Sequence, residues 1–222
     1  MNLKSIYSII FILGGIFFEA NAQVKSYNDI SEYKSSNEFI MSIGWVQPIG
    51  VGNNFANKAF DLGRGVDAQI LLRKDWAEKF VFGLRFQNFN AAIKRKDLVG
   101  NYDNSYINSF GFVVGYTIDL PLNKLTIEPR FTLANTNYRN RARFTNDSNP
   151  SEFASISGRF RDSATSYIIS GTINYSFNDF LSLYFQPEFR WDNMRINTAD
   201  ELSSFFGNVY YVNLSLGLSF RL

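Results

Sequence analysis

The chain has 222 residues, enough for one barrel-sized domain or two small domains. It contains no cysteine and no histidine, which excludes disulfides, thiolate chemistry, Cys- or His-ligated metals and a His-assisted nucleophile. The net charge of +2 is too small to indicate nucleic-acid binding, and no cofactor is expected. Aromatic residues make up 17% of the chain, which favours a lipid-facing surface, with an aromatic-rich β-sandwich core as the alternative.

The first residues of the chain have the three parts of an export signal. A positively charged start precedes an apolar run over residues 6–18, and residues 20–22 form a small-x-small cleavage pattern. The apolar run is too short to cross ~30 Å of hydrocarbon as a helix. We therefore predict a signal peptide over residues 1–22 and a short polar N-terminal lead over residues 23–37. A buried N-terminal strand or helix is the alternative.

Eight segments follow in which apolar residues occupy every second position. The positions between them are mostly Gly, Ser, Thr, Asn and Gln, with a few Arg, Asp and Glu. Bounded by their apolar residues, the segments are Phe39–Trp45, Val66–Leu72, Phe80–Phe86, Phe110–Ile118, Leu125–Leu133, Tyr167–Tyr175, Leu181–Trp191 and Tyr210–Phe220. With the flanking residues, each segment runs about 8–13 residues, against the ~9–11 that a tilted strand needs to cross a bilayer. Eight is also an even number, as in single-chain bacterial barrels.

Alternation alone does not say which face meets water. A soluble lipocalin-like binding barrel has the same period with its apolar face turned inward. Here the polar faces carry no lysine, whereas a narrow lumen favours small residues and arginine–carboxylate pairs.

The connections between the segments alternate in length. The short turns lie at residues 74–79, 121–124 and 178–180, and the long links at roughly 49–63, 90–105, 138–164 and 193–208. Short periplasmic turns with long extracellular loops are typical of outer-membrane barrels. The sequence therefore predicts an all-β fold, an eight-stranded antiparallel up-and-down transmembrane β-barrel over residues 38–222, in the cell outer membrane.

Three prolines lie inside the predicted strands, at Pro48, Pro129 and Pro187. A closed barrel has no edge strand on which a missing N–H is harmless. We therefore expect local bulges or unpaired spots at these positions.

In this pattern the sequence resembles the small outer-membrane β-barrel family of the OmpA and OmpX type, over roughly residues 38–222. Ser215, Gly217, Phe220 and Leu222 look like the family's C-terminal insertion signal, although the family commonly ends in Phe where this chain has Leu222. The resemblance implies that the barrel assembly machinery reads this strand during insertion. It also implies a non-enzymatic protein with a structural or surface-interaction role.

Several charged residues share the parity of the lumen-facing positions. They are Asp67, Arg73, Arg85, Asp119, Glu128, Arg130, Glu188, Arg190 and Arg221. An eight-stranded barrel is just wide enough for its side chains to fill, and an isolated buried charge is costly. We therefore predict that these charges pair with one another in a packed polar lumen. A small-solute or ion channel along the pairs is the alternative, and acid catalysis by Glu128 or Glu188 is a third.

The longest predicted loop carries an arginine stripe. If the flanking strands continue without a bulge, these arginines keep an outward parity beyond the apolar band. Guanidinium groups suit bidentate contacts with phosphates, so we predict lipopolysaccharide as a partner of the stripe. A solvated basic hairpin is the alternative. The residues are Arg139, Arg141, Arg143, Arg159 and Arg161.

Overall fold

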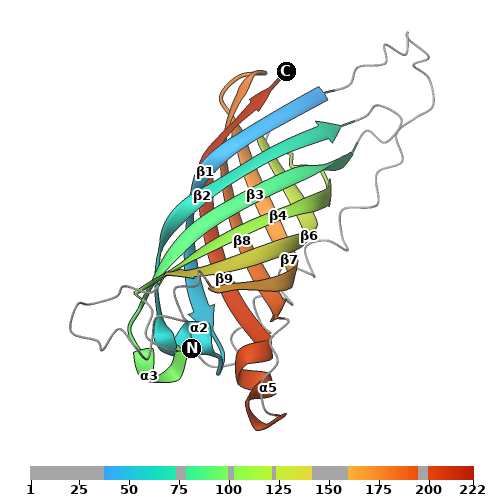
Figure 1. Cartoon of the computed structure of the whole chain (residues 1–222). Helices are drawn as coiled ribbons and strands as arrows, with labels where there is room; N and C mark the ends of the chain where they lie inside the picture. Colours follow the sequence, from blue (N-terminus) through green and yellow to red (C-terminus); the bar gives the residue numbers. More distant parts are fainter. Residues whose placement is uncertain (1–37, 74–78, 100–102, 122–123, 142–159, 195–199) are drawn as a thin grey trace, which may run out of the picture. The chain divides into compact units, whose positions relative to one another are not determined.

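The computed structural model describes residues 38–73, 79–99, 103–121, 124–141, 160–194 and 200–222 (Figure 1). The predicted signal peptide and polar lead lie outside the described residues, as do Arg143 and Arg159 of the arginine stripe.

The described residues form one antiparallel sheet that closes on itself. Its strands are β1 (Glu38–Val51), β2 (Phe60–Arg73), β3 (Phe80–Ile93), β4 (Asn104–Tyr116), β5 (Ile118–Asp119), β6 (Leu125–Arg141), β7 (Phe160–Ser176), β8 (Leu181–Met194) and β9 (Asn208–Arg221). Each long strand pairs with the next, β9 pairs with β1, and β4 pairs with β6. Because β5 continues β4 along the same neighbour β6, the sheet is an eight-stranded closed barrel, as predicted.

The three helices of the described residues are short and lie at one end of the barrel, and the C-terminus lies at the other (Figure 1). They are α2 (Phe55–Ala59), α3 (Lys96–Val99) and α5 (Asp200–Gly207), each in a connection that was predicted as a long link. We name this end the loop end and the opposite end the turn end. No described helix has the length and apolar character needed to cross a membrane.

The strands are longer than the apolar alternation indicated. The fifth predicted segment ended at Leu133, whereas β6 continues to Arg141 in unbroken register with β7. Beyond Leu133 the outward positions of β6 are occupied by Asn135 and Asn137, so the apolar signal stops while the backbone ladder goes on. The pattern therefore reported the apolar part of each strand and missed its polar extension.

The apolar faces of the strands point away from the barrel axis. Ile169, Phe110 and Ile43 are 64%, 57% and 56% exposed, whereas the alternate positions, such as Asp67 and Arg190, are fully buried. Soluble proteins rarely expose apolar surface on this scale, because it favours association or membrane contact. The lipocalin-like alternative, which needs the opposite orientation, is therefore wrong.

Pro129 and Pro187 each lie opposite a gap in one ladder. Pairing between β4 and β6 stops at Gly115 and resumes only at Ile118, so the position opposite Pro129 is unpaired and β5 becomes a separate strand. The β7–β8 ladder likewise lacks pairs beside Pro187, without a change of register. On its other side each proline stays paired, because only the single missing N–H is lost.

Pro48 lies just beyond the point where the β1–β2 ladder ends, at Val46 and Gly65, while its pairing with β9 is intact. The expectation of unpaired spots is thus confirmed at all three prolines. The one register shift in the described ladders lies elsewhere, between Leu62 and Gly65 of β2.

The seam between the first and last strands depends on two glycines. Gly44 and Gly217 are Cα partners across β1 and β9, and the buried ring of Tyr184 packs against them from β8. A Cβ on Gly44 would lie 2.5 Å from the Leu216 carbonyl oxygen and 2.5 Å from the Tyr184 hydroxyl. No side chain fits there without moving the backbone or the tyrosine.

We therefore expect Gly44→Val to lower the free energy of unfolding by about 1–3 kcal/mol, because an overpacked position forces its neighbours apart. Urea titration of the protein folded in lipid vesicles measures the change. Gly171→Ala is the matched control, since a Cβ there meets nothing within 4 Å and stability should be unchanged. An unaltered urea midpoint for Gly44→Val would contradict the close packing of the seam.

Candidate functional site

The barrel interior holds three groups of ion pairs, which follow one another along the barrel axis. The middle group is centred on Arg85 of β3. Its Nε and Nη2 atoms donate to the two Asp67 oxygens at 2.9 and 2.6 Å, and Nη2 also donates to Glu188 at 2.5 Å. Glu188 accepts further hydrogen bonds from Gln87 at 3.0 Å and Asn213 at 2.6 Å. One guanidinium and neutral amides thus hold two buried carboxylates.

The group nearer the turn end is centred on Glu128 of β6. It pairs with Arg130 on the same strand and with Arg73 Nη2 of β2 at 3.0 Å. Arg73 also donates to Glu38 at the start of β1 at 2.5 Å, and Arg221 lies 3.7 Å from the other Glu38 oxygen. The group therefore ties the first and last strands to the middle of the sheet.

The group nearer the loop end is centred on Arg190 of β8. Its Nε and Nη2 atoms donate to Asp192 at 2.8 and 2.9 Å, and the Tyr138 hydroxyl donates to the same carboxylate at 2.5 Å. The guanidinium carbon lies 5.5 and 5.7 Å from the ring centres of Phe89 and Tyr211. These distances are within the range of cation–π attraction, so aromatic rings compensate part of the arginine's lost hydration.

Glutamines join the three groups. Gln87 accepts from Arg190 at 2.8 Å and donates to Glu188, which links the loop-end and middle groups. Gln69 accepts from Arg130 at 2.6 Å and donates to Asp67 at 3.3 Å, which links the turn-end and middle groups. We call the joined set the interior charge network. Its charged members balance, with the arginines Arg73, Arg85, Arg130, Arg190 and Arg221 against the carboxylates Glu38, Asp67, Glu128, Glu188 and Asp192.

The structure places all but one of the predicted lumen charges in this network. Asp119 is the exception: it is exposed at the end of β5, just before a turn, where solvent can reach its carboxylate. Glu38 and Asp192 were missed because the predicted segments started at Phe39 and ended at Trp191. Both have the inward parity of their strands, so extending each segment by one residue would have found them.

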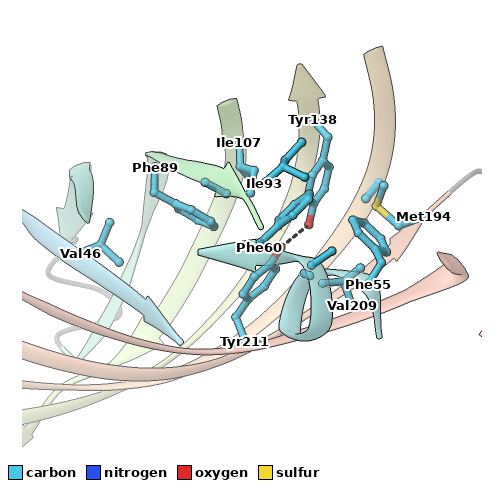
Figure 2. Packing of buried hydrophobic residues seen from close by; sticks show 14 residues of the cluster. Val46, Phe55, Phe60, Phe89, Ile93, Ile107, Tyr138, Met194, Val209 and Tyr211 are labelled. Atoms are coloured by element: carbon cyan, nitrogen blue, oxygen red, sulfur yellow. Dashed lines mark hydrogen bonds between the residues drawn. The ribbon is translucent and has the colours of Figure 1, made fainter. Parts of the chain in front are cut away.

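The predicted packed polar lumen is correct only for the middle of the barrel. At the loop end most inward positions are apolar, and α2 folds into the mouth between the strands (Figure 2). Ala56 and Ala59 of this helix are fully buried, and the Phe55 ring packs against Phe60, Tyr138 and Phe206. We call this apolar cluster the loop-end cap.

Hydrogen bonds hold α2 in this position. The Asn54 side chain accepts from the Asn57 amide at 3.1 Å and donates to the Val51 carbonyl at 2.7 Å, so it caps the helix and fixes its approach to β1. The Lys94 amide, next to α3, donates to the Ala59 carbonyl at 2.7 Å. The amino-acid sequence does not reveal the cap, because a five-residue helix has too few turns to show a helical period.

The arrangement around Glu128 and Glu188 suits counter-ions better than acid catalysts. Each carboxylate accepts from an arginine and from further polar side chains, so its oxygens are occupied by donors. Among the described residues no group of three or more acidic residues could hold a metal ion.

The residues of the predicted insertion signal lie in or next to β9. Ser215 is fully buried, Gly217 forms the seam with Gly44, and the Phe220 ring lies 5.6 Å from that of Phe180. Leu222 follows the strand, is exposed and exchanges two backbone hydrogen bonds with Phe39. The role of these residues in assembly stays a prediction.

The described part of the arginine stripe lies on the long β6–β7 hairpin. Arg139 is exposed on β6, and Arg161 of β7 is its Cα partner. Arg141, the last residue of β6, is the Cα partner of Asn104. Two arginines thus stand at opposite positions of neighbouring strands.

No protein-family model matches the sequence, and no curated protein matches it either. Solved structures do resemble it in fold. Neisserial surface protein A aligns with a TM-score of 0.51 at 12% identity, over 85% of this chain and 99% of that one. The attachment invasion locus protein Ail of Yersinia pestis aligns at 0.50 and 11%, over 84% and 99%.

A major outer membrane protein from Thermus thermophilus aligns with a TM-score of 0.52 at 10% identity, over 83% of this chain and 99% of that one. The chain has the fold of the small outer-membrane β-barrels. At these identities the similarity shows the fold alone. The three alignments include nearly the whole of each similar protein, so the barrel of this chain corresponds to a complete barrel in each.

We expect Arg85→Met to cost about 3–5 kcal/mol of unfolding free energy, because it leaves Asp67 and Glu188 buried without their cation. Arg95→Met is the matched control. Arg95 pairs with Asp97 at 2.6 Å, but both side chains are exposed, so stability should not change measurably. Heat-induced unfolding followed by circular dichroism compares the two variants. Equal melting temperatures would show that the middle ion pairs do not stabilise the barrel.

Proposed function

We propose that the protein is an integral outer-membrane β-barrel, closed to solutes and without catalytic activity, that supports the envelope or presents its loop end to surfaces. The observation that carries the proposal is the orientation of the side chains. Apolar residues cover the outside, and a charge-balanced polar network with an apolar cap fills the inside.

The outer membrane is supported by three independent features. The fold is that of outer-membrane barrels, the sequence predicts a signal peptide, and the last strand resembles an insertion signal. In this arrangement the short connections face the periplasm and the helices of the loop end face the exterior. Both ends of the barrel chain, Glu38 and Leu222, then lie on the periplasmic side.

A closed interior is favoured over a channel. The interior charge network occupies the width of the lumen with paired side chains, and the loop-end cap blocks the mouth with buried rings. A permeant ion would have to separate buried ion pairs, and the separated side chains would be left buried without a counter-ion. A structural or surface role is also consistent with the surface and attachment proteins that share the fold.

A non-enzymatic role is supported by the surroundings of Glu128 and Glu188, the two acidic residues considered as catalysts. A general acid or base must reach a substrate with at least one free oxygen. Glu128 and Glu188 are both at most 4% exposed and are surrounded by arginine and amide donors.

Membrane fractionation with an exterior variant tests the location. Ile169 lies on the outward face of β7, and arginine near the bilayer centre costs about 2–4 kcal/mol. Wild type should remain in the outer-membrane fraction after washing with urea, and Ile169→Arg should reduce the amount assembled there. Asp179→Arg, in an exposed turn, should assemble like wild type. Release of wild-type protein without detergent would refute the proposal.

Planar-bilayer recording tests closure. The purified barrel should show no steady single-channel conductance, because both the network and the cap obstruct the lumen. Regular current steps at constant voltage that persist after repurification would contradict a closed barrel and support the channel alternative.

A further inference from the structure

The outward face of the barrel has a polar surface where β2, β3, β4 and β6 approach the loop end. Asn88, Asn108 and Asn137 are successive Cα partners across β3, β4 and β6, so they form one row. The Asn88 side-chain amide donates to Asn108 at 2.5 Å, and Asn137 donates to Asn135 at 3.3 Å. We call this row with its neighbours Asn90 and Asn135 the asparagine surface.

The asparagine surface lies next to the outward apolar residues of the barrel, on their loop-end side. Phe86 lies two residues before Asn88 in β3, and Phe110 lies two residues after Asn108 in β4. Their side chains are 42% and 57% exposed. On β7, β8 and β9 the corresponding region carries aromatic rings instead. The ring centre of Trp191 lies 5.1 Å from that of Tyr167 and 6.5 Å from that of Tyr210. The barrel therefore has two unlike halves at this rim, one aromatic and one rich in amides, in which Tyr106 lies between Asn90 and Arg139.

An exposed arginine stands on each side of the asparagine surface. Arg64 lies in the bulged segment of β2, which pairs with β3, and Arg139 lies on β6. Three strand spacings separate their strands, which corresponds to roughly 14 Å. Arg139 lies opposite Arg161 in the β6–β7 ladder. Of the two acids nearest Arg64 in the chain, Asp61 pairs with Lys94 and Asp67 lies inside the barrel, where it pairs with Arg85.

We propose that the asparagine surface with Arg64 and Arg139 binds the phosphorylated head group of a glycolipid in the outer leaflet; this inference rests on the proposed outer-membrane function. Guanidinium groups bind phosphate oxygens, and asparagine amides both donate to and accept from sugar hydroxyls. The acyl chains of such a lipid lie along Phe86 and Phe110, on the turn-end side of the asparagine surface. Arg139 belongs to the predicted arginine stripe, and the site extends that lipopolysaccharide contact to Arg64 and the asparagines of the barrel wall.

The test measures lipid retention. Wild type and the variant Arg64→Ala with Arg139→Ala are purified in detergent, mixed with lipopolysaccharide or with its enzymatically dephosphorylated form, and analysed by native mass spectrometry. Wild type should retain phosphorylated lipid, and the double variant should lose about tenfold in retention. The Asn108→Ala variant should retain less phosphorylated lipid than wild type and more than the double variant. Lys124→Ala, exposed at the turn end, is the matched control and should behave like wild type.

Three outcomes would overturn the inference. These are equal retention by wild type and the double variant, equal retention of the dephosphorylated lipid, and displacement of the lipid by an equal concentration of inorganic phosphate. Each variant is first checked for an unchanged melting temperature and for detergent-dependent extraction from membranes. Loss of head-group binding by a protein that is still membrane-integrated would therefore leave the proposed function intact.

Discussion

The narrow interior of a closed eight-stranded sheet is the constraint on which the rest of this structure depends. The lumen is just wide enough for side chains, so any charge placed there loses most of its water. Arg85 and Arg190 lie fully inside, and the carboxylates of Asp67, Glu188 and Asp192 around them balance their charges. Neutrality of the whole network follows from this constraint, and it supports the proposal that the barrel is closed to solutes.

Closure also explains how the sheet contains three prolines. A closed sheet has no edge, so each proline has a neighbour on both sides and removes one backbone donor from one of them. The structure confines each loss to one ladder and leaves the other ladder paired. Pro129 and Pro187 both have outward parity and lie on either side of Gly171, which leaves the tightly packed interior undisturbed.

The two ends of the barrel are held together by different interactions. At the turn end, Glu38 joins Arg73 and Arg221 and so links the first strand with the last. At the loop end, apolar side chains from α2 and the surrounding walls pack together in the mouth of the barrel. The outside differs as well, because amides and arginines replace aromatic rings on one half of the loop-end rim.

The sequence by itself determined the eight strands, the outward direction of their apolar faces, and eight of the charges that meet inside. Each of these is a local property, since a period of two and the identity of alternate residues do not depend on partners. Tertiary structure alone decided which charges pair, because Arg85 and Glu188 are brought together by β3 and β8, far apart in the chain. It also decided the inward fold of α2 and the polar strand extensions, because burial and pairing across the barrel stabilise them and no local pattern marks them.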